Sequence, residues 1–372
     1  MKKILIFSHE FPPYVGGVGS VGAQLATLLR DKYEVTVLTR KLQGRQEIKG
    51  VKFIDVLTFP KLWMINYFIA FKSIVNLDEF DTIILNEAAP TYVAGLFFTP
   101  EQLKKSLVYV HGLEVEHIYQ NNSLIHKLFG LKKYHTNALN LCKKVIFVGR
   151  FMQKKFFKNT ELEPLLKNKN EIIYAGLDTR VFKAQKIDLY SKLQIDTSKK
   201  ILLSVGRVVK EKGFFDKYKI FRRLVKEGSS YHWIIAGEGN DIYQLKEMAK
   251  DDGLDSHITF LGRVDRGHLA PLYASSHLFW LLSNYLEALP LVYLEAQMCG
   301  TLAIGRNNSG VRETIINGRT GYLVDSDEAC YNILKNKDFT VIEEEDILSF
   351  SKQFDFHKTN TKLLELIESD NG

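Results

Sequence analysis

Two glutamates beside one short helix form the part of the chain that is best suited to chemistry. The segment from Ser283 to Gly300 reads SNYLEALPLVYLEAQMCG, and seven residues separate Glu287 from Glu295 within it. Pro290 suits the first turn of a helix because its φ is already helical, and a glycine suits the left-handed end. The free N–H groups at such a helix start attract anions. This pattern predicts a phosphate site between two carboxylates, as a pyrophosphate with a sugar on each side would require.

The alternative interpretation of the two glutamates is a solvated helix face. The helix expected over Leu289 to Met298 is strongly apolar, so we expect it to be buried. A buried glutamate needs a hydrogen-bonding or charged partner, and the sequence alone does not identify one for Glu295.

Two cations follow the first strand expected in the second half of the chain. Residues 200–205 read as a buried strand, and Arg207 and Lys212 come directly after it. The carboxyl end of a parallel strand is where α/β folds bind ligands, and two cations can hold a pyrophosphate and stabilise it as a leaving group. The alternative is a pair of exposed loop cations.

The first half of the chain offers a histidine and a glycine-rich loop at similar places. His111 ends the strand expected over 107–110, where it either serves the reaction or simply satisfies a hydrogen bond. Gly16 and Gly17 follow the strand expected over 3–8. Residues 17–22 also spell a literal GxGxxG, which keeps a nicotinamide dinucleotide site open, with Arg40 in place of the usual acidic residue favouring NADP.

The ordered set of these motifs resembles the retaining glycosyltransferases of family 4, which have the GT-B fold and an E-x7-E signature. The resemblance rests on FPPYVGG at 11–17, HG at 111–112, VGRVVKEKG at 205–213, AGEG at 236–239, FLGRV at 260–264, LEALPLVYLEA at 286–296 and GVRE at 310–313. It extends over most of the chain.

The resemblance implies a role for each matching residue. Glu287 and His111 would be catalytic, contacting the donor sugar, and Glu295 would accept hydrogen bonds from the ribose. The remaining residues implied to bind the donor nucleotide sugar are Gly16, Gly17, Arg207, Lys212, Gly237, Val264, Leu291 and Val292. It also implies attack on the front face of the sugar, assisted by the leaving phosphate, with no cofactor and no metal. The DSD at 325–327 is accordingly expected to be a plain loop.

The length and the strand pattern predict an α/β protein of two domains. A chain of 372 residues exceeds one ordinary core, and the alternation of strands and helices restarts near residue 200. We expect two doubly wound, Rossmann-like domains facing a cleft. Residues 1–175 would bind the acceptor, residues 176–345 would bind the nucleotide sugar, and a helical tail at 346–372 would return to the first domain.

Charge is uneven along the chain. Residues 1–174 carry a net charge of +9 and residues 175–372 a net charge of −2. A basic first half calls for an anionic partner, which we expect to be a lipid-linked glycan or an anionic membrane surface rather than nucleic acid. The main alternative to an enzyme is therefore a basic docking protein without catalysis.

Other segments refine this picture. No run of about 20 apolar residues predicts a spanning helix, and three scattered cysteines fit a reducing cytosol. Residues 62–77 are either a core helix or a helix at the membrane surface. Residues 124–142 are expected to form one helix, and residues 152–158 a basic and aromatic surface. We expect a cytoplasmic transferase that acts in bacterial surface polysaccharide synthesis, either free in the cytoplasm or peripheral on the inner face of the cell membrane.

Overall fold

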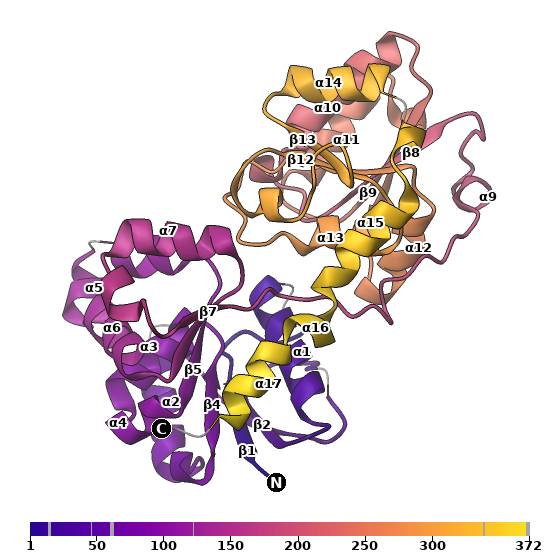
Figure 1. The fold of residues 1–372 in the computed structure, drawn as a ribbon. Helices are drawn as coiled ribbons and strands as arrows, with labels where there is room; N and C mark the ends of the chain where they lie inside the picture. The colour runs from indigo at the N-terminus through magenta and orange to yellow at the C-terminus, as the bar shows by residue number, and fades with distance from the viewer. Residues whose placement is uncertain (14–15, 46, 60–62, 122, 338, 370–372) are drawn as a thin grey trace. The chain divides into compact units, whose positions relative to one another are not determined.

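The computed structural model describes residues 1–13, 16–45, 47–59, 63–121, 123–337 and 339–369. The chain divides into two compact units (Figure 1). The first unit consists of Met1–Tyr174 together with Asn360–Gly372, and the second unit consists of Ala175–Thr359. Each unit is built on its own parallel sheet.

The sheet of the first unit has the strand order β3-β2-β1-β4-β5-β6-β7. From β1 the chain winds outward in both directions, so right-handed crossovers place helices on both faces. Helices on both faces explain why β1 is a continuous apolar run in which the side chains of Ile4 to Phe7 are fully buried. The strands are β1 (Lys3–Phe7), β2 (Glu34–Arg40), β3 (Val51–Val56), β4 (Thr82–Leu85), β5 (Ser106–Val110), β6 (Lys144–Phe147) and β7 (Asn170–Ile172).

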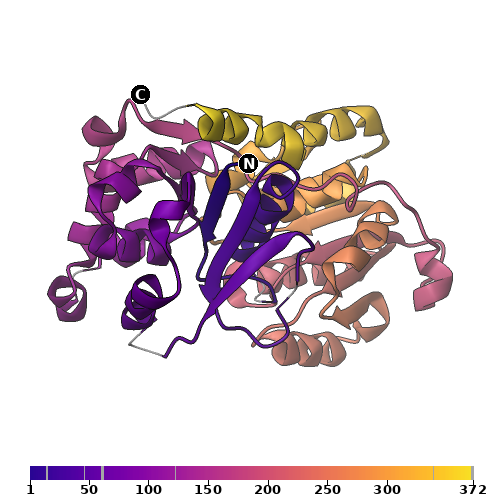
Figure 2. The ribbon, with the colours of Figure 1, turned by 90° about the horizontal axis from the view of Figure 1, so that it is seen from below.

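The last helix of the chain packs on this first unit. Lys2 Nζ donates to the carbonyl of Ile367 at 2.9 Å, and Tyr33 donates to Glu368 at 2.5 Å, so α17 lies beside the start of the sheet (Figures 1 and 2). The helices of the first unit are α1 (Gly17–Leu29), α2 (Trp63–Ser73), α3 (Ala88–Phe97), α4 (Pro100–Lys104), α5 (Leu124–Leu128), α6 (Leu131–Leu141), α7 (Arg150–Thr160), α8 (Glu163–Leu166) and α17 (Thr361–Glu368).

The prediction of one helix over residues 124–142 is wrong. Gly130 adopts a left-handed conformation with φ of 59° and separates α5 from α6. The apolar and basic pattern runs through this glycine without a break, so the sequence signal for a stop was weak. A glycine at a left-handed position ends a helix without steric cost.

Two further surface predictions change with the structure. Phe156 on α7 is fully buried and the Lys155 ammonium pairs with Glu116 at 2.5 Å, so residues 152–158 form the expected basic and aromatic surface only in part, with Lys154 and Lys158 exposed. Helix α2 buries Tyr67 but leaves Ile69 54% exposed, and it thus has both a core face and an apolar surface. Leu62, at the start of the expected helix, lies outside the described residues.

The sheet of the second unit has the strand order β10-β9-β8-β11-β12-β13. It is wound in the same way, outward from β8. Its strands are β8 (Lys200–Val205), β9 (Tyr231–Ala236), β10 (Ile258–Gly262), β11 (Leu278–Leu281), β12 (Ala303–Arg306) and β13 (Gly321–Val324). Its helices are α9 (Leu189–Leu193), α10 (Phe214–Lys226), α11 (Ile242–Asp251), α12 (Leu269–Ala274), α13 (Leu291–Met298), α14 (Asp327–Asn336), α15 (Glu344–Ser351) and α16 (Phe356–Thr359).

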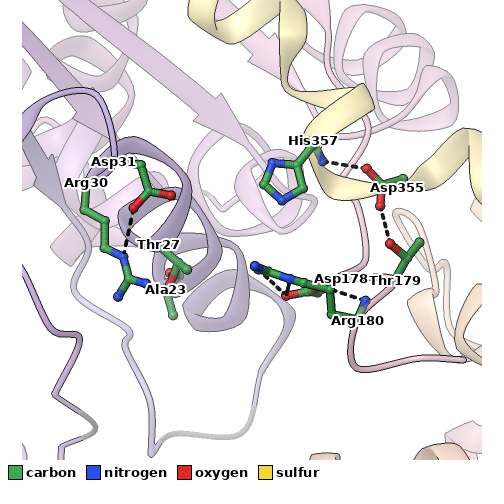
Figure 3. A network of polar contacts seen from close by, with 9 residues as sticks. All are labelled: Ala23, Thr27, Arg30, Asp31, Asp178, Thr179, Arg180, Asp355 and His357. Carbon is green, nitrogen blue, oxygen red and sulfur yellow. Dashed lines mark hydrogen bonds and ion pairs between the residues drawn. The ribbon is translucent and has the colours of Figure 1, made fainter.

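The two stretches of chain that lead into and out of the second unit pair with each other. Leu177 donates its N–H to the carbonyl of Phe354 at 2.9 Å, and its own carbonyl accepts from Phe356 at 2.8 Å. The Thr179 hydroxyl donates to the Asp355 carboxylate at 2.7 Å (Figure 3). A Cβ on Gly176 would lie 2.6 Å from the Cα of Phe356, so glycine permits this close approach. We call residues 175–180 and 354–359 the crossing segments.

Within the described ranges, no helix combines the length and the apolar character needed to cross a membrane.

Candidate functional site

Two loops meet at the centre of the second sheet. The strand order reverses between β8 and β11, and the loops after these two strands therefore emerge side by side at the carboxyl edge, where open α/β sheets bind ligands. The loop after β8 contains the 3₁₀ turn Lys210–Lys212, and the loop after β11 contains Glu287.

Backbone contacts hold these two loops together. Asn284 donates its N–H to the carbonyl of Glu211 at 2.8 Å. Gly213 has φ of 68°, and a Cβ there would lie 1.9 Å from the carbonyl oxygen of Leu282, a distance no side chain could accept. Glycine is therefore required for the approach that positions Lys212.

The structure pairs two of the residues predicted to act on the donor. The Lys212 ammonium donates to Glu287 Oε1, which also accepts a hydrogen bond from the Ser283 hydroxyl at 2.9 Å. The side chains of Lys212 and Glu287 are 19% and 17% exposed. Because both side chains are only slightly exposed, water solvates them poorly, and each charge is stabilised mainly by the other. An anionic ligand at Lys212 would compete with Glu287 for the ammonium.

Helix α13 begins at the same place. Pro290 is its N-cap, and within the described part of the chain the N–H groups of Leu291 and Val292 have no backbone or side-chain acceptor. Tyr293 donates to the carbonyl of Leu281 at 2.5 Å, which fixes the helix to the end of β11. These two free N–H groups can therefore donate hydrogen bonds to an anion, as predicted for a helix N-terminus.

Glu295 is buried, as expected from its helix, and has two partners that the sequence did not reveal. The Arg266 guanidinium donates to Oε1 and the Tyr273 hydroxyl donates to Oε2, each at 3.1 Å. The residue is 5% exposed, and this burial raises the pKa of Glu295 while Arg266 acts to lower it. These partners precede Glu295 by 29 and 22 residues, on a 3₁₀ turn and on α12.

Arg207, Gly237 and Val264 follow the other strand ends of the same edge. A Cβ on Gly237 would lie 1.9 Å from the carbonyl oxygen of Gly206, so this glycine allows the ends of β8 and β9 to pack closely. Arg207 is exposed, and among the described residues its guanidinium has no hydrogen bond or ion pair, whereas its backbone carbonyl accepts from the N–H of Val209 at 3.0 Å. Val264 follows β10, and within the described ranges its N–H and carbonyl have no backbone partner, which leaves both able to bind a ligand.

In the first unit, Gly16 and Gly17 stand at the start of α1. Gly16 is the N-cap, where a Cβ would lie 3.3 Å from Glu10 Oε2, while a Cβ on Gly17 would meet nothing within 4 Å. Tyr14 and Val15 of the same motif lie outside the described residues. A Cβ on Gly22 would lie 3.0 Å from the Asn86 amide, so this glycine serves helix packing. All three glycines of the GxGxxG lie within α1, far from a tight turn after β1, and this is the wrong place for a dinucleotide loop.

His111 lies at the end of β5 with two partners that the sequence did not single out. Its Nε2 lies 3.3 Å from Asn86 Oδ1, and the Glu114 carboxylate accepts the N–H groups of His111 and Gly112 at 3.0 and 2.7 Å. Burial lowers the pKa of His111 to about 4. The imidazole is therefore neutral near pH 7, and because Nε2–H donates to Asn86 Oδ1, Nδ1 can accept a hydrogen bond from a hydroxyl.

The two aspartates at 325–327 have protein partners. Asp325 accepts from Asn307 at 2.8 Å, and Asp327 pairs with Arg306 at 2.6 Å. Among the described residues, no group of three or more His, Cys, Asp or Glu side chains could hold a metal ion.

Two family models match most of the chain. The model for glycosyltransferase family 4 matches residues 15–181, and the model for glycosyl transferases group 1 matches residues 185–331. The chain is 33% identical over 166 residues to N-acetyl-alpha-D-glucosaminyl L-malate synthase of Bacillus anthracis, which is 44% of this chain and 42% of that protein.

Other similarities extend over nearly the full length. The chain is 23% identical to a GDP-mannose-dependent alpha-(1-6)-phosphatidylinositol monomannoside mannosyltransferase of Mycolicibacterium smegmatis, over 87% of this chain and 85% of that protein. The structure resembles that of Anabaena HepE solved in complex with UDP, with a TM-score of 0.79, 18% identity and all of both chains covered.

These matches decide between the classes of protein that the sequence left open. The two models account for both units, and they support a transferase rather than a nicotinamide oxidoreductase or a docking protein. The chain therefore belongs to the glycosyltransferases of the group 1 and family 4 type, which have the GT-B fold of two Rossmann-like domains.

Proposed function

We propose that this protein is a retaining glycosyltransferase that moves a sugar from a nucleotide sugar, such as a UDP- or GDP-sugar, to a glycan or lipid-linked glycan. The observation that carries the proposal is the pairing of Lys212 with Glu287 between β8 and β11. A cation suits the diphosphate, and a neighbouring carboxylate suits the hydroxyls of the sugar attached to it. Relatives named for GDP-mannose and a related fold solved with UDP support such a donor.

In this proposal the second unit binds the donor. Arg207 and Lys212 hold the diphosphate, and the N–H groups of Leu291 and Val292 stabilise it as it leaves. Glu295 accepts hydrogen bonds from the ribose hydroxyls. The backbone of Val264 pairs with the base, and Gly237 keeps the strand ends close enough to form this surface.

The reaction would need no covalent intermediate. Glu287 binds hydroxyls of the donor sugar, and neutral His111 hydrogen-bonds another hydroxyl in the transition state. Gly16 and Gly17 let the backbone approach the donor phosphate and the acceptor. The bond from the anomeric carbon to the phosphate oxygen breaks as the bond to the acceptor oxygen forms on the same face. The acceptor proton passes to the departing phosphate, so this scheme asks for no metal ion and no cofactor.

Ligand binding tests the proposal directly. Thermal denaturation with UDP, GDP, ADP and NADP should show stabilisation by one of the three nucleoside diphosphates and none by NADP, because binding to the native state raises its stability. Lys212→Ala and Glu287→Ala should each lower sugar transfer by about 100-fold or more, which is the usual cost of removing a transition-state contact. Lys210→Ala, an exposed lysine on the same turn, is the matched control. Wild-type turnover in either site variant would refute the mechanism.

For the acceptor, we propose a lipid-linked glycan at the inner face of the cell membrane, as in surface polysaccharide assembly, with the enzyme in the cytoplasm. Helix α5 and its flank expose Leu124, Ile125 and Leu128 by 68–83%, and Lys132 and Lys133 are exposed at the start of α6. Apolar side chains beside lysines are suited to the surface of an anionic bilayer.

Cosedimentation with vesicles tests this surface. The protein should bind phosphatidylglycerol vesicles at low salt and release them at high salt, and Leu124→Ser/Leu128→Ser should weaken binding without lowering the melting temperature. Val341→Ser, at an apolar residue of the second unit that is 68% exposed, is the control. Binding that the double variant leaves intact would place the membrane contact elsewhere, and absence of binding at low salt would refute the surface.

A further inference from the structure

The carboxylate of Glu295 is held by two donors that come from separate elements. Arg266 lies on the 3₁₀ turn Arg266–His268, directly after Val264, and Tyr273 lies on α12. Each donor bonds a different oxygen of Glu295 at 3.1 Å. The two oxygens of one buried carboxylate are thus fixed from two directions.

Aromatic packing restrains both donors. The Arg266 guanidinium carbon lies 5.3 Å from the centroid of the Phe182 ring, and the Tyr273 and Phe182 rings lie 6.4 Å apart. Phe182 is 2% exposed and Tyr273 is fully buried, whereas the Arg266 side chain is 38% exposed. Arg266 is therefore the solvent-facing member of the group.

The remaining hydrogen-bonding capacity of Glu295 matches a vicinal diol. Each oxygen of an ionised carboxylate accepts about two hydrogen bonds. Arg266 and Tyr273 use one position on each oxygen, which leaves one position on each. Two neighbouring hydroxyl groups, such as those of a ribose, can fill both at once.

We propose that Arg266 is a positioning residue that, together with Tyr273, holds the Glu295 carboxylate in the orientation in which its two free acceptor positions select the 2′- and 3′-hydroxyls of a ribonucleotide. This inference rests on the proposed function, since it deepens the role of Glu295 in binding the donor. Arg266 acts through the carboxylate rather than by touching the sugar that is transferred. A deoxyribose leaves one buried acceptor unpaired, and this selects against it.

The experiment compares ribonucleotides with deoxyribonucleotides. Dissociation constants are measured by calorimetry for UDP, GDP and ADP and for their 2′-deoxy counterparts. The wild type should bind the preferred ribonucleotide about 10- to 100-fold more tightly than its deoxy form, which is the range for one buried hydrogen bond to a charged group. Arg266→Met should reduce this ratio to about threefold or less, and Arg266→Lys, which restores a cation, should recover part of it.

The ratio separates positioning from other roles. If Arg266 bound the phosphates directly, Arg266→Met would weaken both nucleotides equally and leave the ratio unchanged, which would overturn the inference. Arg319→Met, at an exposed arginine paired with Asp346 in the same unit, should keep the wild-type ratio. Tyr273→Phe should also lower the ratio, and it provides a second test if Arg266→Met does not fold. Failure of the wild type to bind any of the diphosphates would overturn the proposed function instead.

Discussion

At the scale of single residues, we expect the pair of Lys212 and Glu287 to contribute both to the stability of the fold and to sugar transfer. The two side chains are 19% and 17% exposed, so water solvates neither charge well and each is stabilised by its partner. Removing one partner of a largely buried pair leaves the other charge unpaired, which lowers the stability of the fold more than removing both charges does.

This difference separates the structural role of the pair from its role in the reaction. Lys212→Met should lower the free energy of unfolding by about 1–3 kcal/mol because Glu287 is left without its cation. Lys212→Met/Glu287→Gln should recover most of that loss yet transfer no sugar. Chemical denaturation and a transfer assay measure the two effects. Lys219→Met, which removes an exposed pair with Asp216, should change neither, and an active double variant would contradict our assignment.

The sequence indicated which residues gather at the carboxyl edge of the second sheet, but it did not indicate their side-chain partners. Lys212 and Glu287 were both identified from motifs, and the structure brings them together. Arg266, the partner of Glu295, was missed although a partner was expected, because residues 29 positions apart on a short turn and a helix meet only through tertiary packing. Asn86 and Glu114, beside His111, were missed for the same reason.

At the scale of elements, two glycines decide how closely loops approach the sheet. Gly213 and Gly237 both have positive φ, and a Cβ on either would lie 1.9 Å from a backbone carbonyl oxygen. A backbone oxygen cannot move aside as a flexible side chain can. The loop that bears Lys212 and the loop that follows β9 are therefore positioned by steric fit as much as by hydrogen bonds.

Gly213 gives a direct test of this packing. Gly213→Ala should lower the free energy of unfolding by about 2–4 kcal/mol, the sum of positive-φ strain and displacement from Leu282. It should also lower donor affinity because it moves Lys212. Gly228→Ala is the matched control, since Gly228 has φ of 83° with nothing within 4 Å of its Cβ position, and we expect a cost of about 1 kcal/mol. Equal losses in the two variants, measured by denaturation, would show that strain alone is responsible.

Elements were predictable where local pattern and tertiary environment agree. The central strands β1 and β8 are buried apolar runs because helices cover both faces of each sheet, and their positions follow from the sequence. The break at Gly130 was not predictable, because an isolated glycine in a helical pattern is usually tolerated. Phe156 was assigned to the surface because its lysine neighbours hid the fact that it is buried against Phe147.

At the scale of the whole molecule, the crossing segments join the chain of one unit to the other. Their pairing depends on Leu177, whose N–H and carbonyl are both bonded, and on Asp355. The Asp355 carboxylate accepts the Thr179 hydroxyl and the N–H group of His357 (Figure 3). It also accepts the N–H group of Lys358, and so it both caps α16 and ties the two segments.

Removing this carboxylate should loosen the crossing segments. Asp355→Ala should cost about 2 kcal/mol, from a lost cap and a lost tie, and should speed tryptic cleavage within 175–185. Asp188→Ala removes a comparable cap on α9, where the carboxylate accepts the N–H and the hydroxyl of Ser191, and should cost about 1 kcal/mol without new cleavage. Limited proteolysis followed by mass spectrometry locates the cut. Cleavage unchanged from the wild type would mean that the backbone pairing at Leu177 suffices.

The packing of α17 on the first unit affects how a nascent chain can fold. Residues 175–359 are continuous in sequence, so a ribosome delivers the second unit complete before it has made the residues that contact Lys2 and Tyr33. The first unit, most of which is synthesised first, is thus the last to have all of its residues available for folding. Deleting residues 360–369 should accordingly damage the amino-terminal half rather than the part of the protein next to the deletion.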